Sequence, residues 1–193
     1  MSLGNGNPKE GDKGSNFNYE LKVLQGLEAI AVALEAGIKN PQFIRTSDGT
    51  IVTGTTVATK STSVLIPANT VSAGDSIFVR TRCRKTGTAG SSIQFISVNT
   101  LDAVGGNGIS IASLGNTGAY AQSSRTLVVK SSTSTEVFPY NTGGFDDDAT
   151  STIAVSTYNI DWTQDQYFIF SMQNFNAADS TVTSYYEITV NKG

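Results

Sequence analysis

The apolar residues of the first forty positions follow a helical period. From Phe17 onward they recur at every third or fourth residue, which places them along one side of an α-helix. Asn16 or Asn18 can cap the first turn, because a short side-chain oxygen accepts a hydrogen bond from a free amide there. Gly37, followed by Pro41, is a typical C-terminal stop. The pattern therefore predicts one N-terminal helix.

The apolar face of this predicted helix is unusually wide. Between Leu27 and Leu34 only Glu28 is polar. A face this wide packs on the domain's own core, on further copies of the chain, or in a groove of a partner. The seam covers fewer than three heptads, which is short for an independent coiled coil, so another region must contribute to oligomer stability. We predict an oligomer or anchor interface formed by Phe17, Leu21, Leu24, Leu27, Ala31 and Leu34.

The pattern divides the chain into three parts. Residues 1–15 are polar and rich in Gly, Asn and Lys, and we interpret them as a docking tail. Residues 16–40 hold the predicted helix and a linker. Near Gly37 the apolar period changes from helical to alternating, so residues 41–193 are predicted to form a separate domain.

The third part has the pattern of an all-β domain. Short runs of β-branched and aromatic residues alternate with turns rich in Gly, Asn, Asp and Ser. About eight to ten strands without intervening helices indicate an antiparallel β-sandwich, and a jelly roll fits that strand number. The fold class predicted from sequence is thus mainly β, a jelly-roll-like sandwich preceded by one α-helix. The predicted strands cover residues 51–57, 64–67, 77–84, 93–99, 109–114, 127–130, 153–158, 167–172 and 182–190.

The composition of the chain argues against some classes of binding partner. The net charge of −3 argues against nucleic acid, which needs a basic surface. No apolar run reaches the roughly 20 residues of a membrane span, and the first residues have no hydrophobic core of a secretory signal. We expect assembly in a cytoplasm. Charged residues make up only 15% of the chain, a composition common among extracellular and viral β-proteins.

The residue types present offer little catalytic equipment. The chain has no histidine, which removes Ser-His-Asp and Cys-His catalysis and histidine-ligated metals. Cys83 is the single cysteine and is expected to be a small buried residue in a strand. A glycosidase needs two carboxylates across a sugar, and Asp161, Asp165 and Asp179 cannot be placed in that way from sequence. We therefore expect a protein that is not an enzyme and needs no cofactor.

An acidic run lies in a predicted loop. Asp146, Asp147 and Asp148 follow two glycines and Phe145. Three carboxylates and nearby carbonyls could hold Ca²⁺, which takes six to eight oxygens. A solvated loop tip is the simpler interpretation, and we expect no metal there.

Three arginines alternate along one predicted strand. Arg80, Arg82 and Arg84 are separated by single residues, so their side chains share one face of the sheet. This stripe is either an ordinary exposed face or a contact surface for acidic groups on a partner. Both interpretations stay open, because three like charges in a row repel each other unless partners relieve them.

Five segments spread over most of the chain carry a family resemblance. They are NP…GDKGSNFNYELKVLQ within residues 7–25, VLIPANT at 64–70, RCRKTGTAG at 82–90, IDWT…QY within 160–167 and NAADSTV at 176–182. These segments resemble a family of tailed-bacteriophage virion structural proteins, which are fibre-like proteins with an N-terminal anchor module and a β-sandwich.

The resemblance implies a virion location and a structural function. Under this interpretation the chain is a homotrimeric head (capsid) fibre, docked by residues 1–40 to capsid, portal or tail components. A tail fibre or a receptor module that binds a host surface glycan is the alternative, favoured if exposed aromatics such as Tyr140, Phe145 or Tyr158 line a cleft. A depolymerase would instead require a carboxylate pair in a groove.

Overall fold

The computed structural model describes residues 40–88, 91–116, 118–138 and 155–193. Within these ranges the chain forms strands and no α-helix, so the predicted mainly-β class is confirmed. The predicted tail and helix lie outside the described residues and stay predictions. The same is true of the proposed interface residues Phe17, Leu21, Leu24, Leu27, Ala31 and Leu34.

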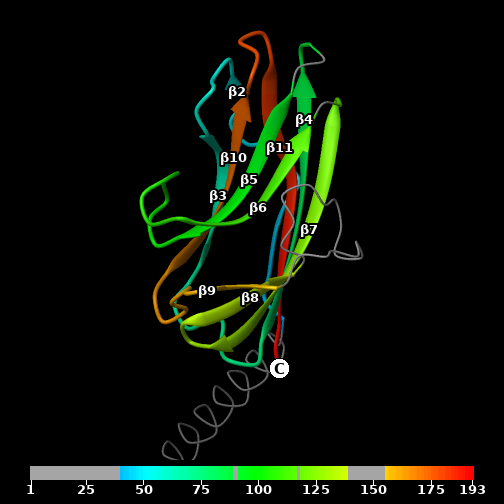
Figure 1. Ribbon diagram of the computed structural model, residues 1–193. Coiled ribbons are helices and arrows are strands. Elements are labelled where there is room, and N and C mark those ends of the chain that lie inside the picture. Colours follow the sequence, from blue (N-terminus) through cyan, green and yellow to red (C-terminus); the bar gives the residue numbers. More distant parts are fainter. Residues whose placement is uncertain (1–39, 89–90, 117, 139–154) are drawn as a thin grey trace, which may run out of the picture. The chain divides into compact units, whose positions relative to one another are not determined.

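The strands form two antiparallel sheets, A and B (Figure 1). Sheet A has the order β1-β11-β4-β7-β8-β9, with β2 also paired to β11, and sheet B has the order β3-β10-β5-β6. Sheet A contains β1 (Gln42–Arg45), β2 (Val52–Thr53), β4 (Ser76–Thr86), β7 (Tyr120–Ser131), β8 (Ser134–Phe138), β9 (Ser156–Tyr158) and β11 (Ser180–Asn191). Sheet B contains β3 (Thr59–Ile66), β5 (Ser92–Asn99), β6 (Ile109–Asn116) and β10 (Gln166–Asn174).

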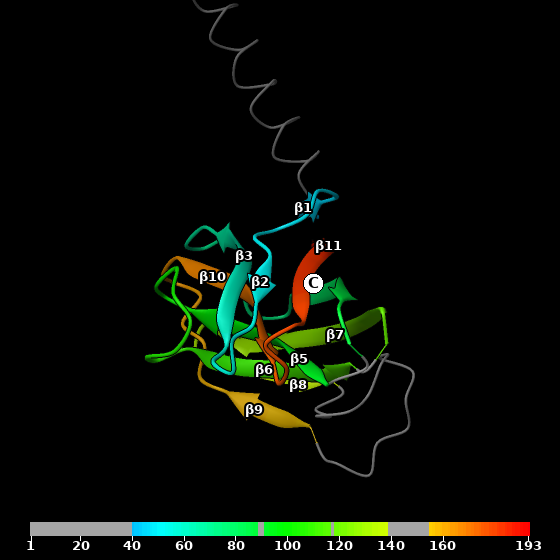
Figure 2. The same ribbon diagram turned by 90° about the horizontal axis from the view of Figure 1, so that it is seen from above.

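The strand pairs are nested. β1 pairs with β11, β3 with β10, β4 with β7, and β5 with β6. Two further pairings, β11 with β4 and β10 with β5, join these pairs into the two sheets. The hairpin partner β8 and the short β9 extend sheet A beyond β7, so β1 and β9 lie at its opposite ends (Figure 2).

The core lies between the sheets because each strand alternates its side chains. In β4, Ile77, Val79 and Cys83 are buried on the inner face, which confirms the prediction for the single cysteine. Sheet B contributes Phe168 and Phe170, both fully buried. Phe170 stacks on Tyr186 of sheet A with ring centroids 5.0 Å apart. Aromatic and branched side chains thus join the two sheets into one core.

Two strands were not predicted, and one prediction was too long. β1 and β8 are only four and five residues long, and the two apolar residues in each are adjacent, so neither shows apolar alternation. The predicted strand over 51–57 is wrong beyond Thr53. Gly54 adopts a positive φ of 61° and Thr55 hydrogen-bonds to Val57, which turns the chain away from β11.

A buried ion pair ties together two connections at one end of the sandwich. Lys85 Nζ lies 3.0 Å from Asp179 Oδ2, and the two side chains are 3% and 0% exposed. The other carboxylate oxygen accepts hydrogen bonds from the amide and hydroxyl of Thr88, at 2.6 and 2.9 Å. Burial by itself would raise the pKa of Asp179, but the hydrogen bonds from Lys85 and Thr88 lower it below the ordinary 3.8. The pair therefore holds the β4–β5 connection against the β10–β11 turn.

A second carboxylate holds the last residues of the chain. Asp75 Oδ2 accepts hydrogen bonds from the Ser72 amide and from Lys192 Nζ, each at 2.8 Å, and Oδ1 accepts one from the Gly193 amide at 3.1 Å. Burial would raise the pKa of Asp75, but these bonds outweigh it and lower the pKa below its ordinary value. The carboxylate therefore fixes the end of β11 against the β3–β4 connection.

We expect the protein to lose stability in acid. A carboxyl whose pKa is lower in the folded chain stabilises the fold above its unfolded pKa, and this contribution disappears as the pH falls through the folded pKa. Asp75 and Asp179 both meet this condition. The free energy of unfolding should therefore be level near neutral pH and fall below about pH 4. Urea unfolding followed by circular dichroism at a series of pH values measures it.

The variant Asp75→Asn is the matched control for this prediction. It has nearly the same size but no charge to lose, so it should be less stable at neutral pH and show a shallower fall in acid. A free energy of unfolding that rises between about pH 5 and about pH 3 would contradict the prediction.

Candidate functional site

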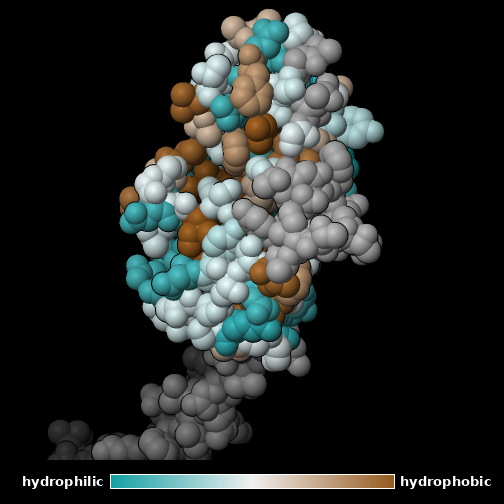
Figure 3. All heavy atoms as spheres, viewed as in Figure 1, coloured by the Kyte–Doolittle hydropathy of each residue, from teal (hydrophilic) through white to brown (hydrophobic). Residues whose placement is uncertain are grey.

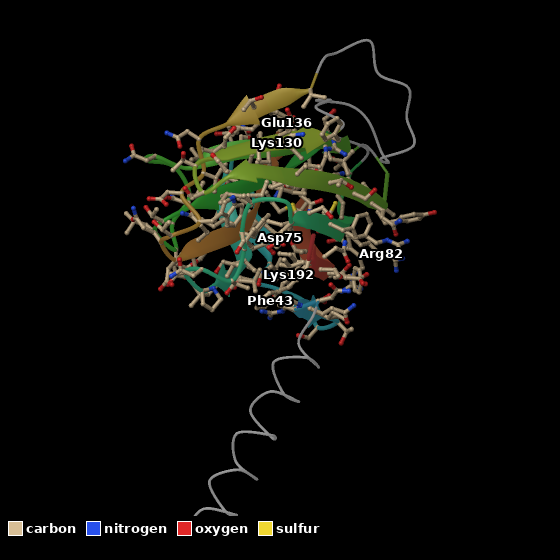
Figure 4. The ribbon with its side chains drawn as sticks, turned by 90° about the horizontal axis from the view of Figure 1, so that it is seen from below. Phe43, Asp75, Arg82, Lys130, Glu136 and Lys192 are labelled. Carbon is tan, nitrogen blue, oxygen red and sulfur yellow. The ribbon has the colours of Figure 1, made fainter. Side chains whose placement is uncertain are left out.

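The arginine stripe lies on the outer face of sheet A. Along β4 the inner residues are buried, whereas Arg82 and Arg84 are exposed and Arg80 is half-buried. The predicted common face of the three arginines is therefore confirmed. Figure 4 shows Arg82 at the periphery of the sandwich, pointing away from its interior.

A bulge in β11 brings two further side chains to this face. The register between β11 and β4 shifts between Thr183 and Tyr185. An extra residue in one strand reverses which side chains face outward beyond it. As a result Tyr185 lies opposite Arg82, and Glu187 lies opposite Arg80. The phenol of Tyr185 donates a hydrogen bond to Glu187 Oε2 at 2.8 Å. Burial and this bond raise the pKa of Tyr185.

The neighbouring strand β7 supplies the other side of the site. Tyr120 lies opposite Arg84, and Gln122 lies opposite Arg82. Tyr120 is 73% exposed, so its ring is available to a ligand. Gln122 accepts a hydrogen bond from Arg82 Nη2 at 3.2 Å through its Oε1.

These side chains surround a hollow in the sheet surface. Arg82, Arg84, Tyr120 and Gln122 line a volume of about 440 Å³, which we call the outer-face hollow. A second hollow of about 300 Å³ shares Arg84 and extends to Asp48 and Ile51. The two hollows adjoin at Arg84, and volumes of this size are within the usual range for small-molecule sites.

The three arginines differ in how their charges are balanced. Arg84 forms an ion pair with Asp48. Arg80 has Glu187 as its cross-strand neighbour. The side chain of Arg82 donates a hydrogen bond to the neutral amide of Gln122. None of the ion pairs among the described residues includes Arg82. Among the described residues, Arg82 therefore has no carboxylate opposite it or paired with it, in contrast to Arg80 and Arg84.

Among the described residues, the face of the domain seen in Figure 3 has no comparable group of side chains. Hydrophobic residues reach the surface there in several places among weakly polar and hydrophilic ones. Individual exposed apolar side chains of this kind are normal for a folded domain. The outer-face hollow, with charge and an aromatic ring together, is the stronger candidate.

The predicted acidic loop lies outside the described residues. This applies to Asp146, Asp147 and Asp148 and to the aromatic candidates Tyr140 and Phe145, so these predictions stay untested. Within the described residues, no three acidic or cysteine side chains are grouped so that they could hold a metal ion. The described part of the chain also contains no helix long and apolar enough to cross a membrane.

The remaining aromatic candidate lies away from the outer-face hollow. Tyr158 in β9 is half-buried and packs against the main hydrophobic core. Its position on the last strand of sheet A places it in the extension of the sheet, whereas the hollow lies over β4 and β7.

The three aspartates considered for glycoside hydrolysis each stabilise a loop. Asp161 accepts hydrogen bonds from Thr163 and Gln164, and these lower its pKa. Asp165 accepts one from the Ala68 amide. Asp179 forms the buried ion pair with Lys85. None of the three aspartates lines the outer-face hollow.

Sequence reasoning identified the arginines but missed Tyr120, Gln122 and Tyr185. The first two precede the apolar part of β7, and a polar strand end looks like a loop in the sequence. Tyr185 depends on the bulge, which has no clear sequence signal. The short alternation of Tyr120 with Gln122 is the only hint that the strand begins before residue 127.

Comparison with known proteins adds no relative. No protein-family model matches the sequence, and no curated protein is significantly similar to it.

Proposed function

We propose that this chain is a non-enzymatic structural protein of a tailed-phage virion, a homotrimeric head fibre whose β-sandwich projects from the particle. The proposal assigns docking to residues 1–40 and projection to the domain that follows. Two observations support the proposal: the resemblance of five sequence segments to tailed-phage virion proteins, and the architecture of the described domain.

The observation that carries the proposal is the nested strand pairing. If β2 and the β8–β9 extension are set aside, the first strand pairs with the last, the second with the second last, and so on inward. A long hairpin rolled into two sheets produces this order, which supports a jelly-roll topology. Jelly rolls recur in viral capsid proteins and lectins. Since one fold serves many functions, the choice of a virion protein rests on the resemblance of the segments.

Oligomeric state tests the proposed trimer. The full-length chain should have about three times its mass of 20.3 kDa in multi-angle light scattering. Leu27→Asp combined with Leu34→Asp should shift it towards monomer, because each acid group would be buried without a partner and, even when protonated, would cost about 2–7 kcal/mol. Val57→Asp is the matched control, since Val57 is 69% exposed in the sandwich. A monomer at all concentrations would contradict the trimer.

Particle composition tests the virion assignment. Mass spectrometry of purified phage particles should find the chain as a stoichiometric component, and an antibody against residues 40–193 should label intact particles. Removal of residues 1–37 should prevent incorporation while leaving a β-type circular dichroism spectrum. Normal incorporation of the shortened chain would show that the sandwich makes the virion contact.

A carbohydrate-binding receptor module is the second candidate function. The outer-face hollow favours it, because Tyr120 is exposed beside Arg82 and Gln122. An aromatic ring with a few convergent polar groups is the usual composition of a small-ligand site. This function is compatible with a fibre, whose projecting domain would meet the host surface.

A further inference from the structure

We infer that the outer-face hollow binds a saccharide that carries a carboxylate, of the uronic or sialic acid class, with Arg82 as the residue that recognises the acid. The inference rests on the carbohydrate-binding candidate function and narrows it to one chemical class and one set of residues. It does not depend on whether the chain is part of a virion.

The charge of the site selects an acidic ligand. Arg84 already has Asp48 as an ion-pair partner, whereas the side-chain hydrogen bond of Arg82 found among the described residues goes to the neutral amide of Gln122. A guanidinium has five N–H donors in a planar fork that matches a carboxylate in two parallel hydrogen bonds. Arg82 therefore has donors left for a ligand, at an exposed position where a ligand carboxylate can reach them.

The flanking side chains suit a sugar ring. Tyr120 is 73% exposed and lies on the strand next to Arg82, so its ring offers an apolar surface to the C–H face of a pyranose. Gln122 has an amide that can both donate to and accept from sugar hydroxyls. Tyr185 borders Arg82 from the other strand. Two guanidinium groups, one amide and one phenol thus line a volume of about 440 Å³.

The position of the hollow argues against an acidic peptide. Peptides that add to a sheet need a free edge strand, because their affinity comes from main-chain hydrogen bonds. Here β4 lies between β11 and β7 and is hydrogen-bonded on both sides. Recognition must therefore come from side chains above the sheet face, which favours a compact ligand with a polar rim and one charge.

A glycan array followed by calorimetric titration tests the inference. The full-length protein should bind glycans that end in sialic or glucuronic acid, and binding should weaken as salt is raised. Titration with N-acetylneuraminic acid, glucuronic acid and glucose should show heat of binding for the first two only. Sulfated glycans on the same array distinguish a carboxylate site from a general anion site.

Three variants assign the binding to this hollow. Arg82→Ala should weaken binding to the acidic glycans at least about tenfold, because an Arg–carboxylate pair is lost. Arg82→Lys should be intermediate, since it keeps the charge but loses the planar fork. Lys130→Ala is the matched control: it removes one positive charge from the exposed side of β7, where Lys130 pairs with Glu136 (Figure 4). It should leave binding unchanged.

Tyr120→Ala provides an independent test that leaves the charge intact. It should also weaken binding about tenfold, with an unchanged circular dichroism spectrum, because the side chain is exposed. Equal binding of neutral and acidic glycans would overturn the acidic preference while leaving carbohydrate binding in place. Binding only to sulfated glycans, no loss with Arg82→Ala, or no glycan binding at all would overturn the inference.

Discussion

Replacement of Trp162 by alanine is expected to lower the free energy of unfolding by about 3–5 kcal/mol. The side chain is 2% exposed and stacks on Phe168 with ring centroids 6.4 Å apart. Its indole Nε1 donates a hydrogen bond to Thr135 Oγ1 at 2.8 Å. The variant would therefore leave a large cavity between β8 and the segment that precedes β10. It would also leave the buried hydroxyl of Thr135 without its hydrogen-bond donor.

Trp162→Phe separates these two effects. It keeps most of the volume and loses the hydrogen bond, so it should cost only about 1–2 kcal/mol. Circular dichroism in urea is the suitable measurement, because Trp162 is the only tryptophan and its fluorescence disappears in both variants. A loss below about 1 kcal/mol for Trp162→Ala would show that the sandwich does not depend on this residue.

Replacement of Gly87 by alanine is expected to have the second largest effect. Gly87 adopts φ 116°, a conformation that a residue with a Cβ rarely takes. A Cβ there would lie 2.5 Å from Asp179 Oδ1 and 2.7 Å from the Ala178 carbonyl oxygen. The substitution thus adds backbone strain of about 1–3 kcal/mol and overpacking of about 1–3 kcal/mol. It also pushes on the carboxylate that Thr88 and Lys85 hold.

Gly74→Ala is the matched control for this prediction. Gly74 also has a positive φ, at 93°, but a Cβ there would meet no atom within 4 Å. It should therefore show the strain alone, and Gly87→Ala should be less stable by about 1–3 kcal/mol in the same urea titration. Equal losses for the two variants would show that the contact with the β10–β11 turn is loose.

The long strands of the domain were predictable because their alternation is strong. β4, β10 and β11 have apolar or β-branched residues at every second position over most of their length, and β5 has four apolar residues among eight. The prediction found all four strands. β1, β8 and the first half of β7 escaped it. β1 and β8 each have only two apolar residues, which are adjacent, and the first half of β7 is mostly polar. They are strands because a neighbour supplies hydrogen bonds to their backbone. Pairing of this kind depends on partners that are far away in the chain.

Part of the candidate site was predictable in the same way. A period of two along β4 is sufficient to put Arg80, Arg82 and Arg84 on one face. The hollow itself was not predictable, since it needs the register that brings Tyr120 and Gln122 opposite two of the arginines. The sequence also did not indicate that Arg84 has an ion-pair partner. That partner is Asp48, which is 36 positions away in the chain and lies against the end of β4 only in the folded domain.

The sequence by itself determined the β class, the positions of the strongest strands and the shared face of the β4 arginines, because these depend on side-chain alternation over a few neighbouring positions. Only the tertiary structure decided the nested pairing, the bulge in β11 and the buried Lys85–Asp179 pair. Each of these joins residues that are distant in the sequence. Their stability comes from hydrogen bonds and burial that exist only after the two sheets have packed together.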